Sequence, residues 1–398
     1  MTVYQPAWLL PISAPPIRNG WVAVEGGRIV ASGAAPAVPA GAVALAGEAL
    51  LPALVNAHTH LELSWMRGQV SPATAMPAWV ERLMALRRTV GHEPPAPIDE
   101  AVRFVRDSGT GLVGDITNTF AAYGALLDSG LSGCVFRELL GFRVEDGEPP
   151  VREAEQQAAR LPASERLRVS VVPHAPYSVS PELLRAIAAA SAGRIVSVHV
   201  AESAEEVEFL RQGTGAWRDL LHSLGAWHDS WRPPGCGAVE YLERFGLVSS
   251  RLLAVHGVQL TDPELQRLAA AGATVVTCPR SNAWTGAGVP PVARFYASGV
   301  RVAIGTDSLA SVEDLNMFGE LAAVRRAAPQ VPARRILDSA TRAGAEALGF
   351  GGDFGTLEAG RRAVFAAVRV PPDVTDVEEY LLSGIEPGDV RPLADPGP

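Results

Sequence analysis

Eight short apolar runs recur along the chain between residues 51 and 304, and they constrain the fold more than any other feature. Longer stretches with the spacing of an amphipathic helix, such as 182–187, separate them. The runs cover residues 51–57, 111–116, 134–140, 168–172, 195–200, 252–258, 273–277 and 300–304. Strands that alternate with helices form a parallel sheet, and eight such units in roughly 250 residues predict an α/β fold of the (β/α)8 barrel type. A doubly wound open sheet is the alternative.

Both ends of the chain have a different pattern. Runs at 21–25 and 28–30 flank Gly26-Gly27, which is a hairpin signal, and the Ala-, Pro- and Gly-rich residues 31–49 predict a connection. After residue 351 the helical spacing stops, and 363–368 again has the pattern of a strand. We therefore expect residues 1–49 and 352–398 to form one small β-sandwich domain beside a catalytic barrel domain of residues 50–351.

One connection within the barrel region is longer than the others. Residues 211–244 contain Trp217, Trp227 and Trp231, which either pack in a core or belong to a substrate lid over the barrel mouth. Three histidines lie away from the predicted strand ends, and we expect surface or lid positions for them: His92, His222 and His228.

Composition excludes several classes of protein. Of 398 residues, 47% are hydrophobic and 19% are charged, which indicates a compact globular protein. The net charge of −9 argues against a nucleic-acid-binding surface. We see neither a signal peptide nor an apolar run of membrane-spanning length. The three cysteines (134, 236 and 278) are scattered and odd in number, which fits the reducing cytoplasm.

The chain contains no lysine, so all 34 basic residues are arginine. A Schiff-base lysine, a pyridoxal-phosphate anchor and a P-loop lysine are therefore excluded. A pair of metal ions bridged by a carbamylated lysine is excluded as well. A compositional bias toward Ala, Arg, Gly and Pro explains the absence of lysine, and the chemical exclusion holds regardless of that origin.

His58 and His60 end the first apolar run. Side chains at i and i+2 of a strand point the same way, so the two imidazoles can share a metal ion. With eight histidines in the chain, chance produces roughly 0.16 such pairs, so the motif needs support from other residues.

That support comes from the ends of other strands, because the carboxyl ends of all barrel strands meet at one mouth. His199 lies in the fifth run, His256 in the sixth and Asp307 just after the eighth. Imidazole and carboxylate ligands suit one divalent ion, with Zn(II) preferred and Fe(II) or Mn(II) also fitting. Three histidines and one aspartate leave room for a water, which indicates a catalytic metal site. Glu202 follows His199 by three residues and is a candidate proton carrier; alternatively it is a solvated helix start.

Motifs along nearly the whole chain carry a resemblance to a known family. They are PPIRNG (15–20), LPALVNAHTH (51–60), HAPYSVS (174–180), HVAE (199–202), CPRSN (278–282), GTDS (305–308) and GTLEAG (355–360). Together they resemble the amidohydrolase superfamily, in its branch of one-metal deaminases and chlorohydrolases. The residues around His60, His174 and Trp231 most resemble aminofutalosine deaminases, which act on an aminated purine nucleoside in menaquinone biosynthesis.

The resemblance implies roles for individual residues. The metal ligands would be His58, His60, His199 and Asp307. Glu202 would carry the proton, His256 would orient the attacking water, and Asp307 would assist. The implied reaction is hydrolytic deamination of a small-molecule heteroaromatic, with release of ammonia. Cyclic amide or imide hydrolysis and chlorohydrolysis are alternatives with the same site, and a catalytically inactive barrel scaffold is an alternative of another class. Family habit suggests a homodimer.

Four further residues are candidate substrate contacts. Glu62 stands where many relatives have another residue, and it either faces the substrate or supports the metal histidines. His174 either contacts substrate or is a hydrogen-bonded loop histidine. Arg280 and Asn282 follow the seventh strand, and they either bind substrate or shape the turn.

Overall fold

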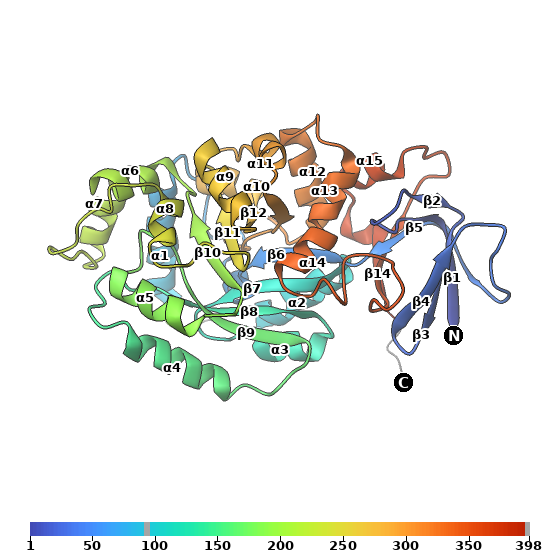
Figure 1. The fold of residues 1–398 in the computed structure, drawn as a ribbon, viewed down its shortest axis with the longest axis horizontal. Coiled ribbons are helices and arrows are strands. Elements are labelled where there is room, and N and C mark those ends of the chain that lie inside the picture. Colours follow the sequence, from blue (N-terminus) through green and yellow to red (C-terminus); the bar gives the residue numbers. More distant parts are fainter. Residues whose placement is uncertain (91–95, 395–398) are drawn as a thin grey trace.

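The computed structural model describes residues 1–90 and 96–394, and all eight predicted central strands are present in it (Figure 1). They form two four-stranded parallel sheets, each in chain order. The first contains β6 (Leu54–Thr59), β7 (Thr110–Thr117), β8 (Ser132–Leu139) and β9 (Leu167–Pro173). The second contains β10 (Val196–Val200), β11 (Leu252–His256), β12 (Thr274–Thr277) and β13 (Arg301–Ile304). The predicted parallel α/β architecture is therefore confirmed.

The two sheets approach each other at both of their edges. The backbone N–H of His199 in β10 donates to the carbonyl of His174, just after β9, at 2.9 Å. At the other edge, the N–H of Asp307 donates to the carbonyl of His58 at 3.0 Å, and Thr59 forms a parallel bridge with Asp307. The continuous strand pairing nevertheless ends within each sheet, so closure into one barrel stays a prediction.

Helices join successive strands, as the alternating pattern predicts. They are η1 (Leu61–Met66), α1 (Met76–Val90), α2 (Ala96–Asp107), α3 (Tyr123–Ser129), α4 (Glu148–Ala159), α5 (Pro181–Ala190), α6 (Ala204–Gln212), α7 (Ala216–Ser223), α8 (Ala238–Glu243), α9 (Asp262–Ala270), α10 (Pro279–Thr285), α11 (Val292–Ser298), α12 (Met317–Ala327), α13 (Ala333–Ser339), α14 (Arg342–Ala347), α15 (Val377–Leu381) and η2 (Pro387–Asp389). All residues of β6, β7, β10, β11 and β12 are buried. Burial on both faces explains why these strands read as continuous apolar runs. Within the described ranges, no helix has the length and apolar character to cross a bilayer.

Strands from both chain ends pair with one another, as expected, on one side of the molecule (Figure 1). The sheet runs in the order β15-β14-β5-β1-β3-β4, with β2 paired to β1. Its strands are β1 (Thr2–Leu9), β2 (Ile17–Arg18), β3 (Trp21–Glu25), β4 (Arg28–Gly33), β5 (Val43–Pro52), β14 (Val364–Arg369) and β15 (Val390–Ala394). The pairing produces a single seven-stranded sheet, so the predicted sandwich of two facing sheets is not confirmed.

The predicted connection at 31–49 is partly wrong. Strand β5 begins at Val43 and runs across the expected domain boundary to Pro52. Its alanines and glycine hide it from propensity arguments, whereas pairing to β1 on one side and β14 on the other stabilises it. The first barrel strand consequently begins at Leu54 rather than at residue 51.

Candidate active site

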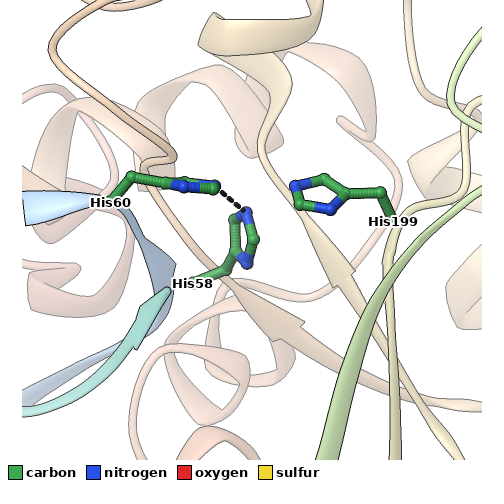
Figure 2. A group of neighbouring side chains, drawn as sticks. All are labelled: His58, His60 and His199. Carbon is green, nitrogen blue, oxygen red and sulfur yellow. Dashed lines mark hydrogen bonds between the residues drawn. The ribbon is translucent and has the colours of Figure 1, made fainter. Parts of the chain in front are cut away.

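Three histidines converge at the ends of β6 and β10. Figure 2 shows the imidazoles of His58, His60 and His199 pointing toward one another, and their ligand nitrogens all lie within 4.8 Å of each other. The Nε2 atoms of His58 and His60 are 3.3 Å apart. His58 and His199 are buried, and His60 is half-buried. Nitrogens at this spacing match a set of ligands around one cation.

Asp307, which follows β13, completes the group. Its Oδ1 lies 3.5 Å from Nε2 of His60 and 4.0 Å from Nε2 of His58. Its Oδ2 accepts a hydrogen bond from the hydroxyl of Ser281 at 2.5 Å. One oxygen is thus fixed by the protein while the other faces the histidines, which is the arrangement that a carboxylate ligand requires.

The protonation of the histidines suits a metal site. Burial lowers the pKa of His60 to about 3 and that of His199 to about 4, and it lowers the pKa of His58 well below its usual value. Neutral imidazoles keep a lone pair for a cation at neutral pH. Three such nitrogens and one carboxylate oxygen fit a divalent ion such as zinc, and no thiolate is needed.

Glu202 and His256 lie beside the histidine cluster. Oε1 of Glu202 is 3.5 Å from Nε2 of His256. The Nε2 of His256 and the Oε2 of Glu202 are buried, and neither has a hydrogen-bond partner within the described ranges. A buried polar atom without a protein partner is costly, so such atoms at a cavity are suited to bind a ligand or a water. Burial also raises the pKa of Glu202 well above its usual value, which favours a carboxyl that carries a proton.

Asn282 holds the ring of His256. Its Nδ2 lies 2.9 Å from Nδ1 of His256, and both side chains are buried. When the amide donates to Nδ1, the ring proton sits on Nε2, which faces the cavity. Asn282 therefore shapes the site through His256, and its direct contact with a substrate stays a prediction.

Strained backbone marks the same ends of the strands. Ala201, His256 and Asp307 have φ angles of +50°, +70° and +64°. L-residues rarely adopt this left-handed region, and such strain concentrates at functional sites. Parallel strands bring these ends to one edge, and Glu202, His256 and Asp307 line one cavity there.

A cavity of about 400 Å³ opens above these residues. Its floor contains polar groups: His60, Asn118, Glu138, His174, His199, Glu202, His256 and Asp307. Its walls are mostly apolar and come from α1 and α7, with Trp79, Leu83, Trp217 and Leu221 among them. Residues 211–244 therefore border the cavity, as a lid would. Trp231, in the same connection, stacks on Phe209 in the adjoining hydrophobic core.

His174 lines the cavity and also supports His199, one of the proposed metal ligands. Its Nδ1 lies 2.6 Å from the hydroxyl of Ser178. Its carbonyl accepts from Nδ1 of His199 at 3.0 Å, which leaves the other nitrogen of His199 for a cation. These contacts are compatible both with a histidine that contacts substrate and with a hydrogen-bonded loop histidine.

Two residues predicted to contact substrate, Glu62 and Arg280, bind neighbouring protein groups in the structure. Glu62 is buried and absent from the described cavity lining, because its oxygens accept from the backbone N–H of Asn118 and the hydroxyls of Thr117 and Thr119. It stabilises the loop after β7. Arg280 is occupied by Glu320 at 2.6 Å and Asp314 at 2.8 Å. Both positions follow a strand, and sequence spacing alone does not show which way a loop side chain turns.

Glu138 is a site residue that the sequence reasoning missed. It is buried at the end of β8, lines the cavity, and places Oε1 3.6 Å from Nδ1 of His199. The sequence contains a signal for Glu138, because this carboxylate lies near the end of the third apolar run, as the other site residues lie near the ends of theirs. Of the histidines assigned to the surface or a lid, His222 stacks on Trp227 and His228 contacts Glu145, whereas His92 lies outside the described residues.

Comparison with known proteins agrees with this geometry. Residues 49–385 match the Amidohydrolase family. The aminodeoxyfutalosine deaminase of Deinococcus radiodurans is 34% identical over 346 residues, which cover 83% of this chain and 81% of the relative. A 5-methylthioadenosine/S-adenosylhomocysteine deaminase of Moorella thermoacetica is 31% identical over 415 residues, which cover 96% of this chain and 90% of the relative.

Solved structures show the same fold. The Helicobacter pylori aminofutalosine deaminase in complex with methylthio-coformycin has a TM-score of 0.85 and 23% identity, over 96% of this chain and 95% of that chain. An adenosine deaminase from Xanthomonas campestris with bound zinc has a TM-score of 0.81 and 25% identity, over 98% of this chain and 90% of that chain. The predicted family resemblance is confirmed: the chain belongs to the amidohydrolase family.

Proposed function

We propose that this protein is a metal-dependent hydrolytic deaminase of an aminated purine nucleoside or a similar heteroaromatic. One observation carries the proposal: the unpartnered Oε2 of Glu202 and Nε2 of His256 are buried beside three converging histidines and Asp307. These groups are the acid, the orienting donor and the ligands that such a reaction needs. Because all of them are present, a catalytically inactive scaffold is disfavoured.

A divalent ion held by His58, His60, His199 and Asp307 would supply an activated water when bound. The protein groups do the remaining work. Glu202, whose pKa is raised well above its usual value by burial, gives a proton to a ring nitrogen and makes the adjacent amino-bearing carbon electrophilic. His256 orients the attacking water through Nε2, and Asp307 takes one proton of that water and passes it to the amine. The carbon–nitrogen bond then breaks to release ammonia, and the remaining hydroxyl proton returns to Glu202 as the carbonyl forms.

The substrate class follows from the cavity and from the relatives. An apolar wall from α1 and α7 above a polar floor suits a flat heteroaromatic ring with an extended substituent. Glu138, on the floor, offers a carboxylate oxygen to sugar hydroxyls. The relatives are named for aminodeoxyfutalosine and for 5-methylthioadenosine or S-adenosylhomocysteine, so we place these nucleosides first. Cyclic amides, imides and chlorinated triazines are the alternative substrates.

Ammonia release by the metal-loaded protein tests the proposal. Aminodeoxyfutalosine, 5-methylthioadenosine, S-adenosylhomocysteine and adenosine form the panel. Glu202→Gln should retain the metal and lose about 1,000-fold or more in kcat, because the amide cannot deliver the proton. Glu205→Gln is the matched control, because Glu205 is half-buried in the first turn of α6, three residues after Glu202, and does not line the cavity. Absence of ammonia release from every nucleoside, together with hydrolysis of an amide or triazine, would refute the deaminase assignment.

The finer features of the protein belong to the same proposal. Zn(II) fits the nitrogen-rich ligand set best, with Fe(II) or Mn(II) as alternatives. We propose that the two parallel sheets close into one (β/α)8 barrel of residues 50–351, and that residues 1–49 and 352–398 form the small β-sandwich domain. A cytoplasmic location agrees with three free, buried cysteines. We expect a homodimer that binds a small molecule and no nucleic acid.

A further inference from the structure

Glu206 is a buried carboxylate with an unusual set of partners. It lies in the first turn of α6 and is fully buried. Its Oε1 accepts the backbone N–H of Ala201 at 2.9 Å, and its Oε2 accepts that of Glu202 at 2.8 Å. Carboxylates are rarely buried unless their oxygens are satisfied, so this pair of bonds is a specific arrangement.

The two N–H groups belong to the turn that aims Glu202 into the cavity. Ala201 adopts a φ of +50°, which L-residues rarely adopt without support from their surroundings. A helix-capping glutamate ordinarily bonds the N–H of the N-cap residue, here Ser203. Glu206 reaches further back along the chain, and its bonds therefore hold the strained turn itself.

The same turn also contacts the cavity wall. The hydroxyl of Ser203 accepts the N–H of Glu206 at 3.2 Å and the indole N–H of Trp217 at 3.3 Å. Trp217 lines the cavity and stacks on Tyr177 with ring centroids 4.1 Å apart. One short segment thus fixes both the proton-carrying carboxyl and part of the surface that meets the substrate.

We propose that Glu206 is a positioning residue that locks the turn at residues 201–203 and so fixes Glu202 for proton transfer. The kinetic part of this inference rests on the proposed deaminase function. Glu206 itself is not among the described residues that line the cavity, nor is it a proposed metal ligand, and its link to the site is the bond to the backbone N–H of Glu202, so its effect passes through Glu202.

Glu206→Gln tests the inference with little change in shape. The amide keeps one acceptor and places an N–H₂ group against a backbone N–H, so one of the two bonds is lost. We expect kcat to fall about 100-fold with KM changed less than about threefold and the metal content unchanged, because a misplaced catalytic group costs rate more than binding. The half-buried Glu205→Gln, in the same turn of α6, should behave as wild type.

Two measurements separate positioning from a general structural role. Hydrogen exchange of a peptide that spans residues 201–203 should become faster in Glu206→Gln and stay unchanged in Glu205→Gln. This readout does not depend on activity. In a double-mutant cycle, Glu206→Gln should cost little further rate once Glu202 is already Gln, since the two residues act as a unit.

Each outcome decides the inference. Unchanged exchange at 201–203, or full additivity in the cycle, overturns it. If the wild type releases no ammonia, the proposed function fails while the exchange experiment still decides the role of Glu206. If Glu206→Gln does not fold, Ala201→Gly is added, because glycine adopts the positive φ without strain. Recovery of folded protein then supports the inference, and continued failure to fold overturns it.

Discussion

Gly305→Ala should damage the metal site although it replaces none of the proposed ligand residues. A β-carbon at Gly305, just after β13, would lie 2.7 Å from the carbonyl oxygen of His58, 2.8 Å from its Cβ and 2.9 Å from its N. Ordinary contact begins at 3.4 Å, so His58 must move by about 0.6 Å relative to its Cβ contact. These are backbone atoms and a Cβ, and a change of rotamer cannot relieve the clash.

The expected magnitudes follow from this displacement. Overpacking of this kind costs about 1–3 kcal/mol of folding free energy. Metal sites tolerate about 0.2 Å in ligand distances, so a movement of His58 by about 0.6 Å should weaken metal affinity by about 10- to 100-fold. The loss should be visible both as reduced metal content after dialysis against a chelator and as a lower melting temperature.

Competitive metal titration and elemental analysis measure the effect. Gly124→Ala is the matched control, because its new β-carbon has no atom within 4 Å and its backbone has no positive φ. That variant should bind metal as wild type does. If Gly305→Ala kept wild-type metal affinity and melting temperature, His58 would not be held against β13 as described, and the reasoning would fail.

Two further predictions concern the histidines. Asn282→Ala leaves the buried Nδ1 of His256 without its hydrogen-bond partner, at a cost of about 1–3 kcal/mol. We therefore expect kcat to fall about 10- to 100-fold, while elemental analysis finds the metal retained. An unchanged kcat would contradict the role of Asn282. The pKa of His174 and of His199 is lowered to about 4 in the folded protein. The unfolded chain therefore binds more protons between pH values of about 6.5 and 4, and the metal-free protein should lose stability as pH falls through this window. Urea unfolding at a pH of about 7 and of about 4.5 checks this, and equal stability would count against buried neutral imidazoles.

The central fold was predictable because burial on both faces leaves a direct trace in sequence. All eight parallel strands were located from continuous apolar runs. Strand β5 was missed because its stability comes from pairing with β1 and β14, which are distant in sequence. Closure at the β9–β10 and β13–β6 edges depends on twist and on loop geometry, and hydrophobic periodicity contains no information about either.

The candidate site shows the same division. Residues at strand ends were placed together by topology alone, so His58, His60, His199, His256 and Asp307 could be grouped across 249 positions. Loop residues were not predictable in this way. Glu62 binds the loop after β7, and Arg280 binds Asp314 and the α12 residue Glu320. Which way such a side chain turns depends on local partners that only the folded structure brings near.

The cavity is built from two kinds of element: strand ends hold the residues for the reaction, and helices hold the residues that select the substrate. Its floor comes from strand ends, whose positions the parallel sheets fix. Its walls come from α1 and α7 in long connections, which tolerate substitution without disturbing the sheets. Relatives with 31–34% identity and different named substrates fit this construction. Substitutions at Trp79 or Leu221 should therefore change KM among nucleosides, whereas those at the strand ends should abolish turnover of all of them.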